Sequence, residues 1–200
     1  MYRPVHPPRA SLAPQEYPTH AMPDRADPPS EPPRPPHFLV GPGYDLLRLE
    51  PLAPAGPGRP LVVGGLRFEH DRGPVGRSDG DALLHAITDA LLGAIAQPDI
   101  GQLFPDTDEA NEARDSAEFL DEAVRRVLAA GYRPANLDAT VILERPKLGP
   151  RKDEMRAHLA GLLGMPTARV NVKGKTHERV DAVGEGRAIE THAVVLLERI

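Results

Sequence analysis

The sequence of 200 residues contains no cysteine. Disulfides, thiolate chemistry and cysteine-bound zinc are therefore excluded, and any metal ion would need ligands from His, Asp and Glu. No apolar run approaches the roughly 20 residues of a membrane-spanning helix, and no signal-peptide pattern opens the chain. The formal net charge of −5 gives no electrostatic reason to expect a nucleic-acid partner. We expect a soluble, cytoplasmic protein that binds neither nucleic acid nor membranes.

Residues 1–36 contain half of the 24 prolines and almost no periodic apolar pattern. Such a segment cannot bury enough surface to offset the entropy lost on ordering, which predicts a disordered Pro-rich tail. The tail is interpreted as a solvated extension or as sequence upstream of a start at Met22, and a docking arm is the alternative. One domain is expected over residues 38–200.

Apolar periodicity in this domain alternates between strand and helix spacing. The predicted strands are Tyr44–Leu49, a hairpin over Leu61–Phe68, Leu137–Leu143, a strand marked by Val170 and Val172, and Ala188–Arg199. The predicted helices are Asp81–Ala96, Ser116–Ala130 and Lys152–Leu163. These lengths predict an α+β fold, an α/β sandwich with one sheet and helices on one face.

The first predicted helix carries an unusual polar series. Asp81, His85 and Asp89 follow at steps of four residues, so one carboxylate lies a turn before the histidine and one a turn after it. A metal-binding histidine needs an acceptor for its second ring nitrogen, and this spacing offers two. A solvated helix face with an unconnected histidine is the alternative. Asp45 lies inside a predicted strand, where a charge needs a partner.

A polar segment follows this helix, over residues 99–108. It combines turn-forming residues with three carboxylates, which favours a binding loop, and an exposed turn is the alternative.

Residues 41–200 resemble the 2-C-methyl-D-erythritol 2,4-cyclodiphosphate synthase family of the non-mevalonate isoprene biosynthesis pathway. The matching motifs are Gly43-Tyr44-Asp45, Ser78-Asp79-Gly80-Asp81, His85, Asp89 to Ala94, Asp99-Ile100-Gly101, Phe104 to Asp108, Asp115-Ser116, Pro146-Lys147, Val172-Lys173, Thr176, Glu178 and Gly184-Glu185-Gly186.

The resemblance implies a homotrimer of four-stranded sheets backed by helices, with active sites at the subunit interfaces. It implies a lyase that converts 4-diphosphocytidyl-2-C-methyl-D-erythritol 2-phosphate to the cyclic diphosphate and releases CMP. It also implies two divalent cations, one zinc-like, held by Asp45 and His85, and one magnesium or manganese at the diphosphate, near Glu178.

Further roles follow from the same resemblance. The implied catalytic residues are Thr176, Arg77 and Ser78. The implied substrate-binding residues are Asp99, Gly101, Phe104, Pro105, Asp106, Thr107, Asp108, Leu143, Pro146, Lys147, Leu148 and Glu178.

The sequence departs from the family pattern at three places. Leu47 stands where the family has a metal-binding histidine, Arg77 stands where it has another histidine, and the charges of Glu185 and Arg187 are exchanged. Losing a metal ligand weakens binding by more than the roughly 10–100-fold of an outer-shell loss, unless His177 replaces it. Two hypotheses therefore stand: a working synthase, or a weakened or inactive member that binds cytidine nucleotide or isoprenoid phosphate without turnover.

Overall fold

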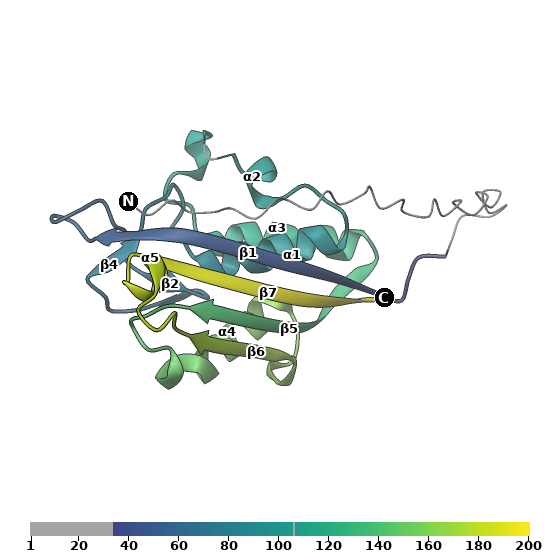
Figure 1. Ribbon diagram of the computed structural model, residues 1–200. Helices are drawn as coiled ribbons and strands as arrows, with labels where there is room; N and C mark the ends of the chain where they lie inside the picture. Colours follow the sequence, from purple (N-terminus) through teal and green to yellow (C-terminus); the bar gives the residue numbers. More distant parts are fainter. Residues whose placement is uncertain (1–33, 106) are drawn as a thin grey trace, which may run out of the picture. The chain divides into compact units, whose positions relative to one another are not determined.

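The structure, a computed structural model, describes residues 34–105 and 107–200. Its main sheet has five strands in the order β4-β1-β7-β5-β6, and Figure 1 shows β1, β7, β5 and β6 side by side. Their bounds are β4 Arg72–Pro74, β1 Phe38–Pro51, β7 Ala188–Arg199, β5 Tyr132–Ile142 and β6 Val170–Lys175. All neighbouring pairs are antiparallel except β5 and β6, which are parallel.

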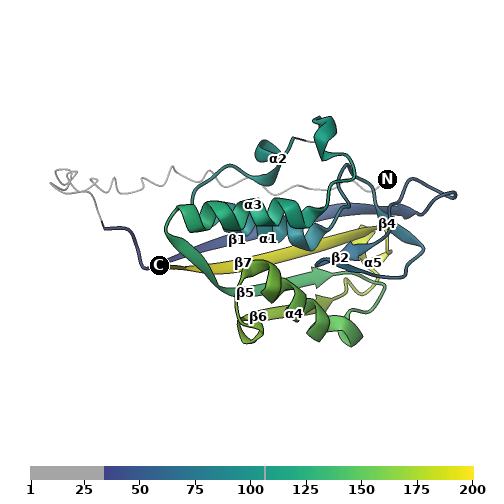
Figure 2. The same cartoon turned by 180° about the vertical axis from the view of Figure 1, so that it is seen from behind.

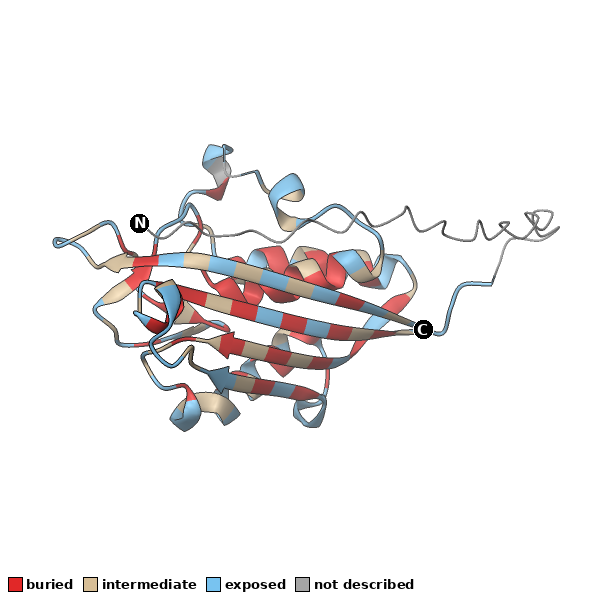
Figure 3. Ribbon diagram, viewed as in Figure 1, coloured by how far each residue is buried: buried red, intermediate tan, exposed pale blue. Residues whose placement is uncertain are grey.

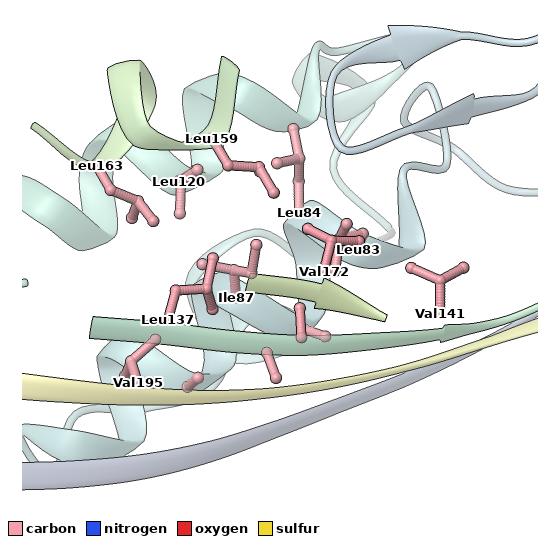
Figure 4. Packing of buried hydrophobic residues seen from close by; sticks show 14 of the residues in the cluster. Leu83, Leu84, Ile87, Leu120, Leu137, Val141, Leu159, Leu163, Val172 and Val195 are labelled. Atoms are coloured by element: carbon pink, nitrogen blue, oxygen red, sulfur yellow. The ribbon is translucent and has the colours of Figure 1, made fainter. Parts of the chain in front are cut away.

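Three helices cover one face of this sheet, as the view from behind shows (Figure 2). They are α1 Ala82–Ala94, α3 Ser116–Ala129 and α4 Lys152–Leu163. Figure 4 shows apolar side chains of the helices and the strands meeting in the core between them. The shorter elements are β2 Val62–Val63, β3 Leu66–Arg67, α2 Ile100–Leu103, α5 Asp181–Gly184 and 3₁₀ turns at Glu109–Asn111, Gly149–Arg151 and Thr167–Arg169.

The opposite face of the sheet carries exposed apolar side chains. Exposed residues alternate with half-buried or buried ones along β1, and buried residues alternate with exposed or half-buried ones along β7, because successive side chains point to opposite faces (Figure 3). The large apolar residues on the uncovered face are Phe38, Val40, Tyr44, Leu46 and Val194, each between 46% and 63% exposed. An apolar surface of this kind is typical of a protein interface.

Several expectations need correction. The sheet has five strands rather than four, because the short β4 pairs with the end of β1 and contains Gly73 and Pro74, which carry no strand pattern. Apolar spacing over Ser116–Ala130 also predicts that Leu128 faces inward, but it is 46% exposed because it lies about 100° around the helix from the buried Val127. The predicted tail lies, up to residue 33, outside the described residues. Among the described helices, none is long and apolar enough to cross a membrane.

Candidate functional site

Asp81 fixes the start of α1 and the loop beside it. Its side chain accepts hydrogen bonds from the backbone N–H groups of Leu83 and Leu84 in the first turn, at 3.1 and 3.0 Å. It also accepts from the N–H groups of Gly64 and Gly65 in the β2–β3 turn. A carboxylate that caps a helix and a turn at once is a structural anchor.

Asp45 of β1 is the partner of His85. Oδ2 of Asp45 lies 3.0 Å from Nδ1 of His85, one turn into α1. The expectation that Asp81 or Asp89 would hold this ring is therefore wrong: Asp81 caps the helix, and Asp89 accepts the N–H of Ile100 at 2.8 Å. Helical spacing allowed those contacts, but backbone donors compete for both carboxylates. The predicted need of Asp45 for a partner is confirmed.

The second ring nitrogen of His85 faces two serines. Nε2 lies 2.9 Å from Oγ of Ser116 and 3.3 Å from Oγ of Ser78. The Ser116 hydroxyl donates its one proton to Asp79, so it accepts from His85, while Asp45 accepts from the other nitrogen. This arrangement favours a His85 ring that carries a proton on both nitrogens.

Electrostatics agree with this assignment. Burial alone would lower the pKa of His85, but the hydrogen bond to Asp45 and the charges of Asp45, Asp81 and Asp79 outweigh it, so the pKa is raised.

A pocket of about 200 Å³ opens beside His85, and we call it the Arg77 pocket. Its walls are Leu47, Gly76, Arg77, Ser78, Gly80, His85, Ile100, Gly101, Phe104, Asn111 and Phe119. The side chain of Leu47 therefore lies on the same side of β1 as Asp45, two residues away, as strand geometry requires. The structure brings five predicted site residues together here: Arg77, Ser78, His85, Gly101 and Phe104.

The segment 99–108 contributes only part of its residues to this pocket. Gly101 and Phe104 line it, and the Phe104 ring packs on Phe119 with centroids 4.5 Å apart. Asp99 instead caps the short helix α2 by accepting the N–H of Gln102 at 2.9 Å. Pro105, Thr107 and Asp108 are exposed and lie outside the pocket wall, and Asp106 lies outside the described residues.

A second pocket, which we call the lysine pocket, forms where the parallel strands β5 and β6 end. Ile142 and Lys175 are register partners, so the segments that follow each strand lie at the same sheet edge. Ligands bind characteristically beyond the carboxyl ends of parallel strands. The cavity of about 390 Å³ is lined by Leu143, Lys147, Leu148, Gly149, Lys152, Gly174, Lys175, Thr176 and Glu178.

Most of the residues predicted to bind the cytidine and the phosphates line this pocket. The hydroxyl of Thr176 bonds Oε1 of Glu178 at 2.9 Å, and Pro146 is the predicted residue that does not line the cavity. Sequence reasoning missed Lys152 and Lys175. A signal existed, because Lys175 ends β6 in register with the end of β5, but it requires knowing that the two strands are parallel.

Three further side chains named from the sequence, those of His177, Glu185 and Arg187, have partners outside the two pockets. Nδ1 of His177 lies 2.9 Å from Oδ2 of Asp181. Arg187 and Glu185, the exchanged pair, bond each other through Nε and Oε2 at 2.7 Å. Glu185 also lines a cavity of about 480 Å³ that contains none of the predicted site residues.

Comparison with known proteins gives a consistent result. A model of the YgbB family matches residues 38–198. The chloroplastic 2-C-methyl-D-erythritol 2,4-cyclodiphosphate synthase of Catharanthus roseus is 53% identical over 162 residues, which are 81% of this chain and 66% of that protein. The synthase of Chromobacterium violaceum is 52% identical over 160 residues, 80% of this chain and 98% of that protein. A solved structure of such a synthase in its CDP-bound form superposes with a TM-score of 0.71 and 40% identity, over 80% of this chain and 99% of that one.

Proposed function

The chain belongs to the YgbB family, and on that basis we propose that it converts 4-diphosphocytidyl-2-C-methyl-D-erythritol 2-phosphate to 2-C-methyl-D-erythritol 2,4-cyclodiphosphate and CMP. The observation that carries the proposal is the match of the whole domain, at about half identity over 160 residues, to synthases of this name. The lysine pocket supports it independently, because its chemistry suits a nucleoside diphosphate.

The lysine pocket binds the cytidine diphosphate part of the substrate. Lys147, Lys152 and Lys175 surround one acidic side chain, Glu178, so the cavity attracts a diphosphate. Leu143 and Leu148 offer an apolar wall for the base. The Thr176 hydroxyl lines this pocket and donates its hydrogen bond to Glu178. With substrate bound, it donates to a phosphate oxygen instead.

The Arg77 pocket binds the methylerythritol phosphate part. Phe104 and Gly101 shape an enclosure for a short carbon chain, and Ser78 and Arg77 offer donors to the phosphate. In the reaction, an oxygen of the 2-phosphate forms a bond to the β-phosphorus, and the bond from that phosphorus to the bridging oxygen breaks. CMP leaves with the electron pair. Positioning and charge neutralisation supply most of the catalysis.

Membership of the family implies a metal-dependent enzyme in general, without specifying the metal or its ligands. Glu178 fits a magnesium or manganese ion, which is bound typically by one or two carboxylates together with substrate phosphates. Such an ion would neutralise charge on the diphosphate. Asp45 and His85 do not fit a zinc-like ion, because Leu47 beside them has no donor atom to serve as a third ligand.

Assembly as a homotrimer is part of the proposal. The exposed apolar face of β1 and β7, with Val40, Tyr44, Leu46 and Val194, supports burial against another copy. The two pockets are built from different elements of the chain, so an active site shared between copies could join them. A cytoplasmic location stays a prediction.

The experiment is an assay of CMP release from the cytidyl substrate by the purified full chain with magnesium present. CMP formed together with the cyclic diphosphate supports the proposal. Binding of the substrate without CMP release would instead support the second hypothesis, a family member that binds without turnover.

A further inference from the structure

The side chains of Asp45 and His85 are hydrogen-bonded to each other. Oδ2 of Asp45 bonds Nδ1 of His85 at 3.0 Å, and Nε2 of the same ring faces Ser116 at 2.9 Å. Ser116 is fully buried and is bonded in turn to Asp79. A cation held by both Asp45 and His85 would have to replace the proton that they share.

The donors around this pair are too few for a metal ion. A zinc site takes three protein ligands and keeps one position for water or substrate. Leu47 is the side chain of β1 beside Asp45 and His85 where a third ligand would be needed. It lines the Arg77 pocket and has no donor atom. Within residues 34–105 and 107–200, no three His, Asp or Glu side chains come together as a metal site.

Arg77 offers a positive charge in the same pocket. Its guanidinium contacts Glu112 at 3.5 Å, in a pair whose side chains are 43% and 52% exposed. Exposed pairs of this length hold a side chain weakly. The guanidinium can therefore turn to an anion in the pocket, where two parallel N–H groups match two phosphate oxygens.

We propose that the Arg77 pocket takes the phosphate monoester of the substrate directly on the guanidinium of Arg77, with no divalent cation held between Asp45 and His85. The inference rests on the proposed function for the identity of the phosphate. Asp45 and His85 then act as positioning residues: they hold α1 against β1 and place Ser78, whose hydroxyl lies 3.3 Å from His85, beside the anion.

The test titrates the full chain with inorganic phosphate in the presence of a chelator, followed by phosphorus NMR. Arg77→Ala should weaken phosphate binding about tenfold or more, since it removes a charge-assisted hydrogen bond. Arg77→Lys should give an intermediate affinity, because it keeps the charge but loses the planar fork. Arg125→Ala is the control: Arg125 pairs with Asp121 and Glu122 on α3 and does not line the Arg77 pocket, so phosphate binding should not change.

Zinc titration of the wild type and of Asp45→Asn gives the second readout. Equal zinc uptake by the two proteins is expected. Phosphate binding that disappears in chelator, or zinc uptake that falls by one ion per chain in Asp45→Asn, would overturn the inference.

The two proposals fail separately. If the protein releases CMP and Arg77→Ala binds phosphate as tightly as the wild type, the proposed function stands and the inference is overturned. If phosphate binding depends on Arg77 but the protein releases no CMP, the Arg77 anion site stands and the proposed function is overturned.

Discussion

Gly43 of β1 lies directly against Ala86 of α1: a Cβ atom added at Gly43 would be 1.8 Å from the carbonyl oxygen of Ala86. Gly41 makes the same kind of approach to Ala90. At these two glycines the backbone of β1 packs directly against the backbone of α1, with no side chain between them. Asp45 lies two residues after Gly43 and His85 lies directly before Ala86, so this contact brings the two side chains into hydrogen-bond range.

Gly43→Ala should therefore destabilise the protein by about 3 kcal/mol or more, since the backbone of β1 or α1 must shift to admit the methyl group. Gly93→Ala is the control. Gly93 is in α1, where an added Cβ meets nothing within 4 Å, so alanine should be neutral or stabilising by up to about 1 kcal/mol. Urea denaturation measures both. Equal stabilities of the two variants would contradict the packing described for β1.

Asp81→Ala should cost about 2–4 kcal/mol. The substitution removes the helix cap, typically worth 0.5–2 kcal/mol, and leaves the N–H groups of Gly64 and Gly65 without their acceptor. Asp81→Asn keeps one oxygen and should lose less. Asp121→Ala, at a side chain 75% exposed, should change stability by less than about 0.5 kcal/mol. A value for Asp81→Ala as small as this control would contradict the anchoring role.

Much of the architecture could be predicted because local patterns fix it. Helix α4 begins and ends at the predicted residues, and Gly164 follows it in the left-handed conformation, with φ of 64°. Strand β7 alternates buried and exposed residues and also matches. The partner of His85 could not be predicted from the helix, because Asp45 is forty residues away in sequence and reaches it through the contact at Gly43. The roles assigned to site residues stay predictions.

The lysine pocket predicts a local effect on nucleotide binding. Lys147→Ala should weaken binding of CDP about tenfold, because a charge-assisted hydrogen bond to phosphate contributes roughly 1.5–3 kcal/mol. Lys173→Ala is the control: its Nζ bonds Asp138 at 2.8 Å and it does not line the cavity. Calorimetric titration with CDP measures both. An equal loss in both variants would indicate a general charge effect rather than a site.

The uncovered face of the sheet predicts the assembly. Sedimentation should give a trimer for the wild type, and Val40→Glu should dissociate it, because an interfacial carboxylate without a partner is costly to bury. Val40 is 63% exposed in the single chain, so its replacement should not disturb the fold of the subunit. Val180→Glu, at a residue that is 66% exposed outside the sheet, is the control and should leave the trimer intact. A wild type that sediments as a monomer at micromolar concentration would contradict the trimer.

Leu47→His should create the metal site that the present residues do not complete. Leu47 lies two residues from Asp45 and lines the pocket beside His85, so an imidazole at this position would be the third ligand. Zinc should bind at least about tenfold more tightly than to the wild type, taking the smaller effect of an outer-shell residue as the lower bound. Leu128→His is the control, since Leu128 is 46% exposed on α3 and does not line the Arg77 pocket. Zinc titration at neutral pH, with CMP release measured in parallel, tests the substitution.

The two measurements separate the outcomes. A rise in zinc affinity and in CMP release indicates a synthase limited by charge neutralisation at this pocket. A rise in zinc affinity alone indicates that Arg77 already neutralises the charge there. Equal zinc affinity in the wild type and Leu47→His would contradict the account of Leu47, because either the wild type already binds the ion or the side chain does not reach it.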